Sequence, residues 1–253
     1  MTQWIAVSRT QHADKHYLPR EGYDFASKQP MAQVLLAELA KLLPHYPLGF
    51  IKQGEHYVPV ALLGTEQNLY VAPSGKWLGK YVPASLRGYP FTLASNETGE
   101  KALAIEADYL SDDAGKPLFA EGEPTKSVAD TLAFLTQCEN NRQTTQAACQ
   151  ALESAGILTP WPLTVPIGES RKRFNGLYRV DEQALNTLDA ETYATLQGAP
   201  MQLAYAQLYS IAQTEQLTQR AALQERLAQA QAPANLDELF GEEDDDLEFD
   251  FGS

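Results

Sequence analysis

The sequence predicts an α+β protein: a β-rich N-terminal half, then a helical C-terminal half and a disordered acidic tail. Short runs of β-branched and aromatic residues fall within about the first 110 residues, and long stretches without Pro or Gly begin at about residue 125. Strands followed by helices argue against a doubly wound parallel sheet. We expect one body over residues 1–232 and a disordered tail over residues 233–253.

In the N-terminal half the pattern predicts one short helix among several strands. The helix covers residues 31–43, where apolar residues recur at helical spacing until Pro44 ends the run. A tight turn is expected at Ser74 and Gly75. The strands are expected at residues 4–7, 46–51, 57–63, 68–71, 91–94 and 103–107.

In the C-terminal half helices predominate. Residues 125–155 predict one or two helices, with Ser127 as a candidate N-cap and Gly156 as a stop. A turn-rich segment then leads into a short strand at residues 176–180. Helices are expected over residues 185–196 and 201–230, the second leaving the body toward its end, before Pro233 stops it.

The formal net charge of −14 is concentrated in the tail, where residues 233–253 hold nine acidic residues and no basic one. A negative body and tail repel phosphate backbones, so nucleic acid is not an expected partner. Cys138 and Cys149 lie about 16 Å apart on a continuous helix, beyond the reach of a disulfide. We therefore expect free thiols in a reducing compartment.

The chain begins without a signal-peptide pattern and holds no apolar run of about 20 residues. We therefore expect a soluble, cytoplasmic protein without membrane insertion. Type I export through an uncleaved C-terminal signal stays open. The sequence does not indicate an oligomeric state or a cofactor.

Residues 64–93 interleave aromatic and basic side chains with proline and glycine in an otherwise acidic protein. Aromatics and arginine dominate binding hot spots, and the cations suit an acidic peptide or a carboxylate. The alternative is that the aromatics fill the core and Arg87 closes an internal ion pair. The candidate partner-binding residues are Lys76, Trp77, Lys80, Tyr81, Arg87, Tyr89 and Phe91.

The acidic tail carries apolar residues that a purely solvating tail does not need. Such segments often dock apolar anchors into a partner's groove. The tail is expected to contact a partner, or the aromatic segment of its own chain, or only to keep the protein soluble. The candidate contacts are Leu239, Phe240, Leu247, Phe249 and Phe251.

Several blocks of the chain, in order, resemble the SapC family of bacterial proteins. The central block includes EQNLY at residues 66–70, GKW at 75–77, YVPA at 81–84 and YPF at 89–91. GKPLF at residues 115–119 and GLYRVDE at residues 176–182 continue it, so that the resemblance covers roughly residues 10–220. The family's name implies an association with a surface-layer locus, and it carries no catalytic motif to transfer.

These observations favour a non-enzymatic binding or accessory protein that recognises a protein or peptide partner in the making, export or modification of an envelope protein. No catalytic residue and no metal site is predicted, although His12 and His16 stand four residues apart. One alternative is an exported surface-layer component. The other is an enzyme with a dispersed site, whose acids and bases would be Glu66, Asp108, Glu121 and Glu123.

Overall fold

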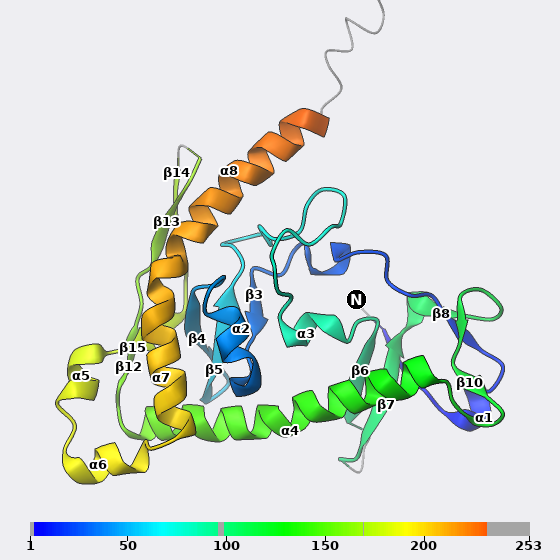
Figure 1. Cartoon of the computed structure of the whole chain (residues 1–253), viewed down its shortest axis with the longest axis horizontal. Helices are drawn as coiled ribbons and strands as arrows, with labels where there is room; N and C mark the ends of the chain where they lie inside the picture. The colour runs from blue at the N-terminus through cyan, green and yellow to red at the C-terminus, as the bar shows by residue number, and fades with distance from the viewer. Residues whose placement is uncertain (1–2, 96–98, 169, 232–253) are drawn as a thin grey trace, which may run out of the picture.

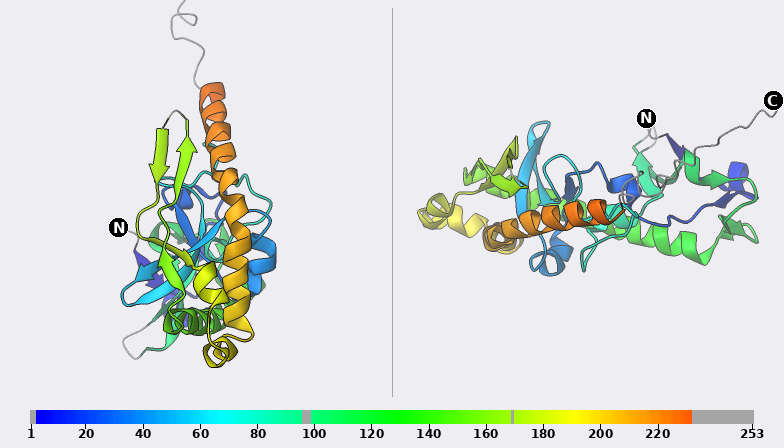
Figure 2. Two further views of the ribbon diagram at one scale, coloured as in Figure 1. Left: turned by 90° about the vertical axis from the view of Figure 1, so that its left-hand side faces the viewer. Right: turned by 90° about the horizontal axis from the view of Figure 1, so that it is seen from above.

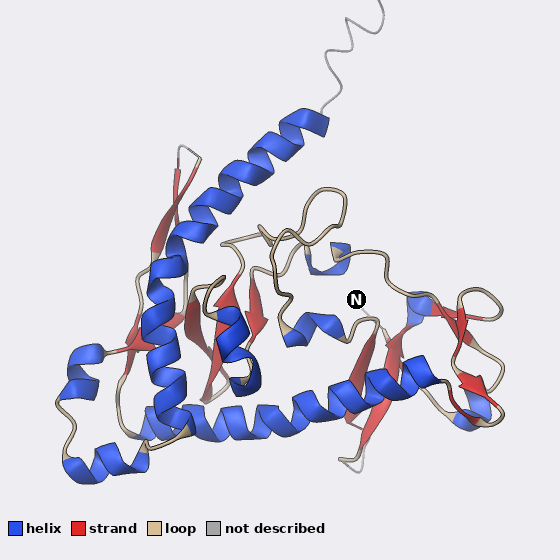
Figure 3. Cartoon of the chain, viewed as in Figure 1, coloured by secondary structure: helices blue, strands red, loops and turns tan. Residues whose placement is uncertain are grey.

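The computed structural model describes residues 3–95, 99–168 and 170–231, and its largest sheet has five antiparallel strands (Figures 1 and 3). In the β4–β5 hairpin, Gln53 pairs with His56 and Gly54 has φ +63° in the two-residue turn, a backbone conformation that favours glycine. Strands from both halves of the chain share this sheet. Its order is β12 (Leu158–Pro160), β15 (Leu177–Val180), β4 (Leu48–Gln53), β5 (His56–Leu62) and β3 (Met31–Gln33).

A smaller antiparallel sheet of the described chain has the order β1 (Trp4–Ala6), β7 (Lys101–Glu106) and β6 (Phe91–Ser95). The short helix α1 (Arg9–His12) follows β1. Two-residue strands pair nearby, β2 with β8 and β9, and β10 with β11. They are β2 (His16–Tyr17), β8 (Leu110–Ser111), β9 (Lys116–Pro117), β10 (Phe119–Ala120) and β11 (Glu123–Pro124).

The buried apolar side chains form a larger and a smaller core. The larger core surrounds the five-stranded sheet and includes Phe50, Leu62 and Tyr70, each with no exposed surface. The smaller core lies against the β1–β7–β6 sheet and consists of Tyr17, Phe91, Leu103, Ile105, Leu118 and Val128. Burial of these side chains stabilises each part of the fold.

The helix α4 (Lys126–Ser154) belongs to both cores. Its 29 residues span about 43 Å at the usual rise of an α-helix. Val128, near its start, is buried in the smaller core, whereas Cys149 and Leu152, near its end, are buried in the larger core. Figure 1 shows α4 as one continuous helix that runs beneath the larger sheet and crosses the smaller one.

The two long C-terminal helices pack on different sheets. The helix α7 (Ala199–Ser210) contacts α4, β4 and β15, and a 3-10 turn, η4 (Ile211–Gln213), leads from it into α8 (Thr214–Gln231). Figure 2 shows α8 beside the hairpin of β13 (Thr164–Ile167) and β14 (Ser170–Arg173). The remaining short elements are η1 (Asp24–Ala26), η2 (Leu36–Glu38), α2 (Leu39–Leu42), α3 (Ala84–Arg87), η3 (Ala107–Tyr109), α5 (Glu182–Asn186) and α6 (Ala190–Thr195).

The predicted α+β class is confirmed, with its β-rich start and its long C-terminal helices. The helix predicted over residues 125–155 is the single helix α4, and Gly156, with φ +68°, follows its last residues as predicted. Thr125, rather than Ser127, is its N-cap residue. Both cysteines are free, as expected.

Several predicted elements are wrong. Residues 31–33 are the strand β3 instead of the start of a helix, because pairing with β5 outweighs their helical spacing. Residues 68–71 are a turn with one bridge, from Val71 to Trp77. The turn-rich segment 159–175 contains the β13–β14 hairpin, and the helices predicted at 185–196 and 201–230 are each divided. The predicted tail lies outside the described residues.

Candidate functional site

The structure does not gather the seven predicted partner-binding residues on one surface. Trp77 is buried in the larger core, stacked on Tyr70 with ring centroids 5.7 Å apart, and its indole donates to the Tyr81 carbonyl at 3.0 Å. Lys76 and Lys80 are exposed on either side of it. At Trp77 the structure thus has the alternative arrangement, in which the aromatic ring fills the core.

Tyr81 and Arg87 form a network with Glu38. The Glu38 carboxylate accepts from the Leu35 backbone at 3.0 Å, the Tyr81 hydroxyl at 3.0 Å and the Ala84 backbone at 2.8 Å. Burial raises the pKa of Glu38, and burial followed by the Glu38 charge raises the pKa of Tyr81 to about 12. Arg87 donates to the Tyr81 hydroxyl at 3.2 Å. The network fastens α3 to the turn before α2.

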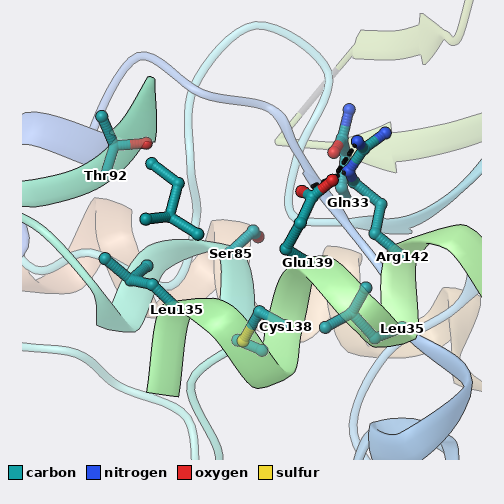
Figure 4. A pocket seen from close by; sticks show the side chains of 10 residues that line it. Gln33, Leu35, Ser85, Thr92, Leu135, Cys138, Glu139 and Arg142 are labelled. Atoms are coloured by element: carbon teal, nitrogen blue, oxygen red, sulfur yellow. Dashed lines mark hydrogen bonds and ion pairs between the residues drawn. The ribbon is translucent and has the colours of Figure 1, made fainter. Parts of the chain in front are cut away.

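Two cavities flank this network, and both are too small for a ligand site. They measure about 150 and 180 Å³, below the roughly 300–1,000 Å³ typical of ligand pockets. In the one drawn in Figure 4, Glu139 of α4 faces Arg142, and Cys138 appears between Leu135 and Leu35. Burial raises the pKa of the Cys138 thiol. The larger of the two lies between α3, β6 and α4, and the smaller lies between η2, α2, α3 and α4.

Glu139 also joins the smaller sheet to α4, because it forms ion pairs with both Lys101 of β7 and Arg142 of α4. The distance from Arg142 Nη2 to Glu139 Oε1 is 2.6 Å. Hydrogen bonds, first from Arg142, lower the pKa of Glu139 to about 2. A lowered pKa means that this carboxylate stabilises the fold above its unfolded pKa of about 4.5 and loses that contribution as the pH falls toward 2.

We predict that Glu139→Gln lowers the free energy of unfolding by about 1 kcal/mol at neutral pH, since both cations are partly solvated. The difference from the wild type shrinks as the pH falls from 4.5 toward 2. Urea unfolding at pH 7 and pH 3 measures both values. A difference that is the same at both pH values contradicts the prediction.

Tyr89 and Phe91 lie at a wider opening, which we call the inter-core cleft. It consists of two adjoining cavities of about 690 and 430 Å³, both lined by Phe25, Tyr89 and Glu106. The rings of Phe25 and Tyr89 stack with centroids 3.8 Å apart. The first cavity is further lined by Leu18, Pro19, Glu21, Gly22, Asp24, Asp108 and Tyr109, and the second by Trp4, Gln29, Ser85, Leu86, Phe91 and Thr92.

Both cores supply walls of the inter-core cleft. Leu86 and Phe25 belong to the larger core, whereas Phe91 and Tyr109 belong to the smaller one. The segment that carries Phe25 contacts Gly75 closely at two points, Tyr23 and Asp24. The Tyr23 N–H donates to the Gly75 carbonyl at 2.8 Å, and a side chain on Gly75, which has φ +76°, would meet Asp24 at 2.1 Å. The predicted turn at Ser74–Gly75 thus anchors one wall of the cleft.

The first cavity is acidic. Glu21, Asp24, Glu106 and Asp108 line it, and neither cavity has a Lys, Arg or His in its described lining. Burial, followed by the charge of Asp108, raises the pKa of Glu106. Glu106 Oε2 is shielded from solvent and has no hydrogen-bond partner among the described residues. The pKa of Tyr109 is also raised, by burial and then by these four carboxylates, with Glu106 contributing most.

Of the four acids named as possible catalytic groups, Asp108 alone lines either cavity of the cleft. Glu66 pairs with Lys172 at 2.9 Å, and Glu123 pairs with Arg9 at 3.1 Å. Glu121 lies in an exposed turn with φ +52°. The sequence analysis did not predict four residues that line the cleft: Trp4, Phe25, Glu106 and Tyr109. They come from segments far apart in sequence, and no linear motif joins them.

Within residues 3–95, 99–168 and 170–231, no cluster of three or more His, Cys, Asp or Glu is placed to hold a metal ion. His12 ends α1 and His16 lies in β2, so their four-residue spacing does not put them on one helix face. No described helix is long and apolar enough to cross a bilayer. The tail candidates Leu239, Phe240, Leu247, Phe249 and Phe251 lie outside the described residues.

Fold and site together define an α+β protein in which a larger and a smaller core, bridged by one long helix, meet at an aromatic, acidic cleft. The chain belongs to the SapC family, whose model matches residues 7–217. The match includes every residue of the cleft except Trp4 and ends within α8. No curated protein matches the chain, and no solved structure matches it.

Proposed function

We propose that this protein is a non-enzymatic binding or accessory protein that recognises a protein or peptide partner in the inter-core cleft. The observation that carries the proposal is the cleft itself, with cavities of about 690 and 430 Å³ that are both lined by the stacked residues Phe25 and Tyr89. Aromatic walls supply contact area at low entropic cost. An extended segment can place successive side chains of one face in two such adjoining cavities.

The proposed setting is the cytoplasm, in the making, export or modification of a bacterial envelope protein. The family resemblance supports this setting through the locus after which the family is named. The acidic cleft changes one part of the expectation from the sequence: the surface offered to the partner carries carboxylates, whereas Lys76, Lys80 and Arg87 do not line it.

Site-specific photo-crosslinking in the native cells tests the proposal. A photoreactive residue at Gln29, which is exposed and lines the second cavity, should give a discrete adduct with one partner. The same residue at Tyr209, which is 70% exposed on α7, should not. Adding Trp4→Ala should reduce the Gln29 adduct. Equal adducts at both positions, or none at Gln29, would contradict the proposal.

An enzyme with a dispersed active site in the same cleft is the second candidate. The raised pKa of Glu106 favours it, because a carboxyl group whose pKa is raised by burial is suited to act as a general acid or base. A Glu106→Gln variant distinguishes the two functions. Loss of chemical conversion of the captured partner, with capture itself retained, would favour the enzyme.

A further inference from the structure

The inter-core cleft combines two kinds of wall that together select a ligand by charge. The first cavity has the carboxylates of Glu21, Asp24 and Asp108, and Glu106 lies where the two cavities adjoin. The stacked aromatic rings of Phe25 and Tyr89 belong to residues that line both cavities. Carboxylates together with aromatic faces attract ammonium and guanidinium groups, through charge-assisted hydrogen bonds and cation–π contacts.

Arg20 and Arg87, which are next in sequence to the cleft residues Glu21 and Leu86, lie over aromatic rings. Arg20 lies over the Tyr23 ring, 4.3 Å from its centroid, and Arg87 lies over the Phe134 ring at 4.7 Å. The shielded oxygen of Glu106 has no donor within the described parts of the chain. The described lining of the first cavity, with four carboxylates and no Lys, Arg or His, therefore carries negative charge that an incoming cation would neutralise.

The second cavity has a different character. Trp4, Leu86 and Phe91 give it apolar walls, and Glu106 is its one acidic lining residue in the described chain. In an extended peptide, side chains two residues apart project from one face about 6.6 Å from each other. Because the two cavities share Phe25, Tyr89 and Glu106 in their linings, neighbouring side chains of one face, at positions i and i+2, are the pair we assign to them, a cationic one to the first cavity and an apolar one to the second.

The acidic tail of the protein does not match this chemistry. Residues 233–253 hold nine acidic residues and no basic one, so the cleft carboxylates repel them. The same argument disfavours a second copy of this chain presenting its tail. Charge complementarity thus requires an occupant that brings positive charge.

We propose that the occupant of the inter-core cleft is an extended partner segment that carries a lysine or arginine two residues from an apolar side chain. This inference rests on the proposed function and names the chemistry of its partner. The cation lies among the first cavity's carboxylates and the apolar side chain lies against Trp4. Specificity comes from charge and from the i, i+2 spacing.

The tryptophans provide a built-in readout. Trp4 is 40% exposed at the second cavity, whereas Trp77 and Trp161 are 8% and 7% exposed. Acrylamide therefore quenches Trp4 preferentially, and an occupant of the cleft should protect it. The probe is a synthetic peptide that repeats Lys-Ser-Leu-Ser, compared with peptides of equal length in which Gln or Glu replaces every Lys. All measurements use the full chain.

We expect the lysine peptide to protect Trp4 from acrylamide quenching in a saturable manner. The glutamine and glutamate peptides should leave Trp4 accessible to acrylamide. The variant Glu106→Gln/Asp108→Asn should weaken binding about tenfold or more, because it removes charge-assisted contacts. The matched control Glu182→Gln/Glu191→Gln removes the same number of charges from exposed positions on α5 and α6. It should change binding less than about twofold. Circular dichroism verifies that both variants fold.

Protection by the glutamine peptide that equals that of the lysine peptide would overturn the cationic occupant and leave peptide recognition in the cleft standing. Lysine-peptide binding that the cleft variant does not weaken would also overturn it, because binding would then lie elsewhere. If no peptide protects Trp4, the inference fails. The proposed function fails with it only if the Gln29 crosslink also captures nothing.

Discussion

Replacing Glu38 with alanine is expected to lower the free energy of unfolding by about 3 kcal/mol. Glu38 is only 3% exposed, and its carboxylate accepts from two backbone N–H groups and the Tyr81 hydroxyl. Removing it leaves buried donors unpaired, which costs about 1–3 kcal/mol each before relaxation. Urea unfolding followed by circular dichroism measures the loss.

Two further variants test the cause of that loss. Glu38→Gln keeps the volume of the side chain and one acceptor oxygen. Its free energy of unfolding should therefore lie between that of the wild type and that of Glu38→Ala. Glu55→Ala removes an exposed glutamate from the β4–β5 turn and should change stability by less than about 0.5 kcal/mol. If Glu38→Ala costs no more than Glu55→Ala, Glu38 does not brace the fold.

Gln207→Ala is the second large effect, with an expected cost of about 2–3 kcal/mol. Gln207 of α7 is 1% exposed and fastens two neighbouring strands of the larger sheet. Its amide oxygen accepts from the Val180 N–H at 2.9 Å, and its amide nitrogen donates to the Leu48 carbonyl at 3.2 Å. The variant leaves both backbone groups without this partner.

The matched control is Gln202→Ala, on the same helix at an exposed position. Both substitutions have the same small effect on helix propensity, so their difference isolates the buried contacts. We expect Gln202→Ala to be neutral or slightly stabilising in the same urea measurement. Equal midpoints for the two variants would show that the contacts of Gln207 contribute nothing.

Local patterns predicted the elements whose stabilising contacts are close in sequence. The hairpin strands β4 and β5 and the long helix α4 followed from residue type and spacing. Residues 31–33 were assigned wrongly because their partner is β5, some thirty positions away, and nothing in the segment itself indicates that pairing. The β13–β14 hairpin was missed because its prolines and charges resemble a loop, although α8 covers it.

The candidate site was predicted in part. Tyr89 and Phe91 lie in the inter-core cleft, and so does Asp108, which was considered only as a catalytic group. Trp77 was a candidate partner-binding residue but lies in the larger core. Aromatic residues occur both in cores and on recognition surfaces, and the sequence alone does not separate the two roles. Glu106 could be identified as a site residue only from the structure, in which it lines the cleft together with Phe25 and Tyr89.

The helix α4 spans both cores and thereby fixes the width of the inter-core cleft. Phe25 and Leu86 pack in the larger core, Tyr109 and Phe91 pack in the smaller one, and α4 is anchored in both. We therefore expect any widening of the cleft to bend α4 or to unfold it locally between its two anchored ends. The rate of amide hydrogen exchange in the middle of this helix would therefore report whether the cleft widens. A partner that wedges the walls apart should quicken exchange there, and one that fits the resting width should slow it.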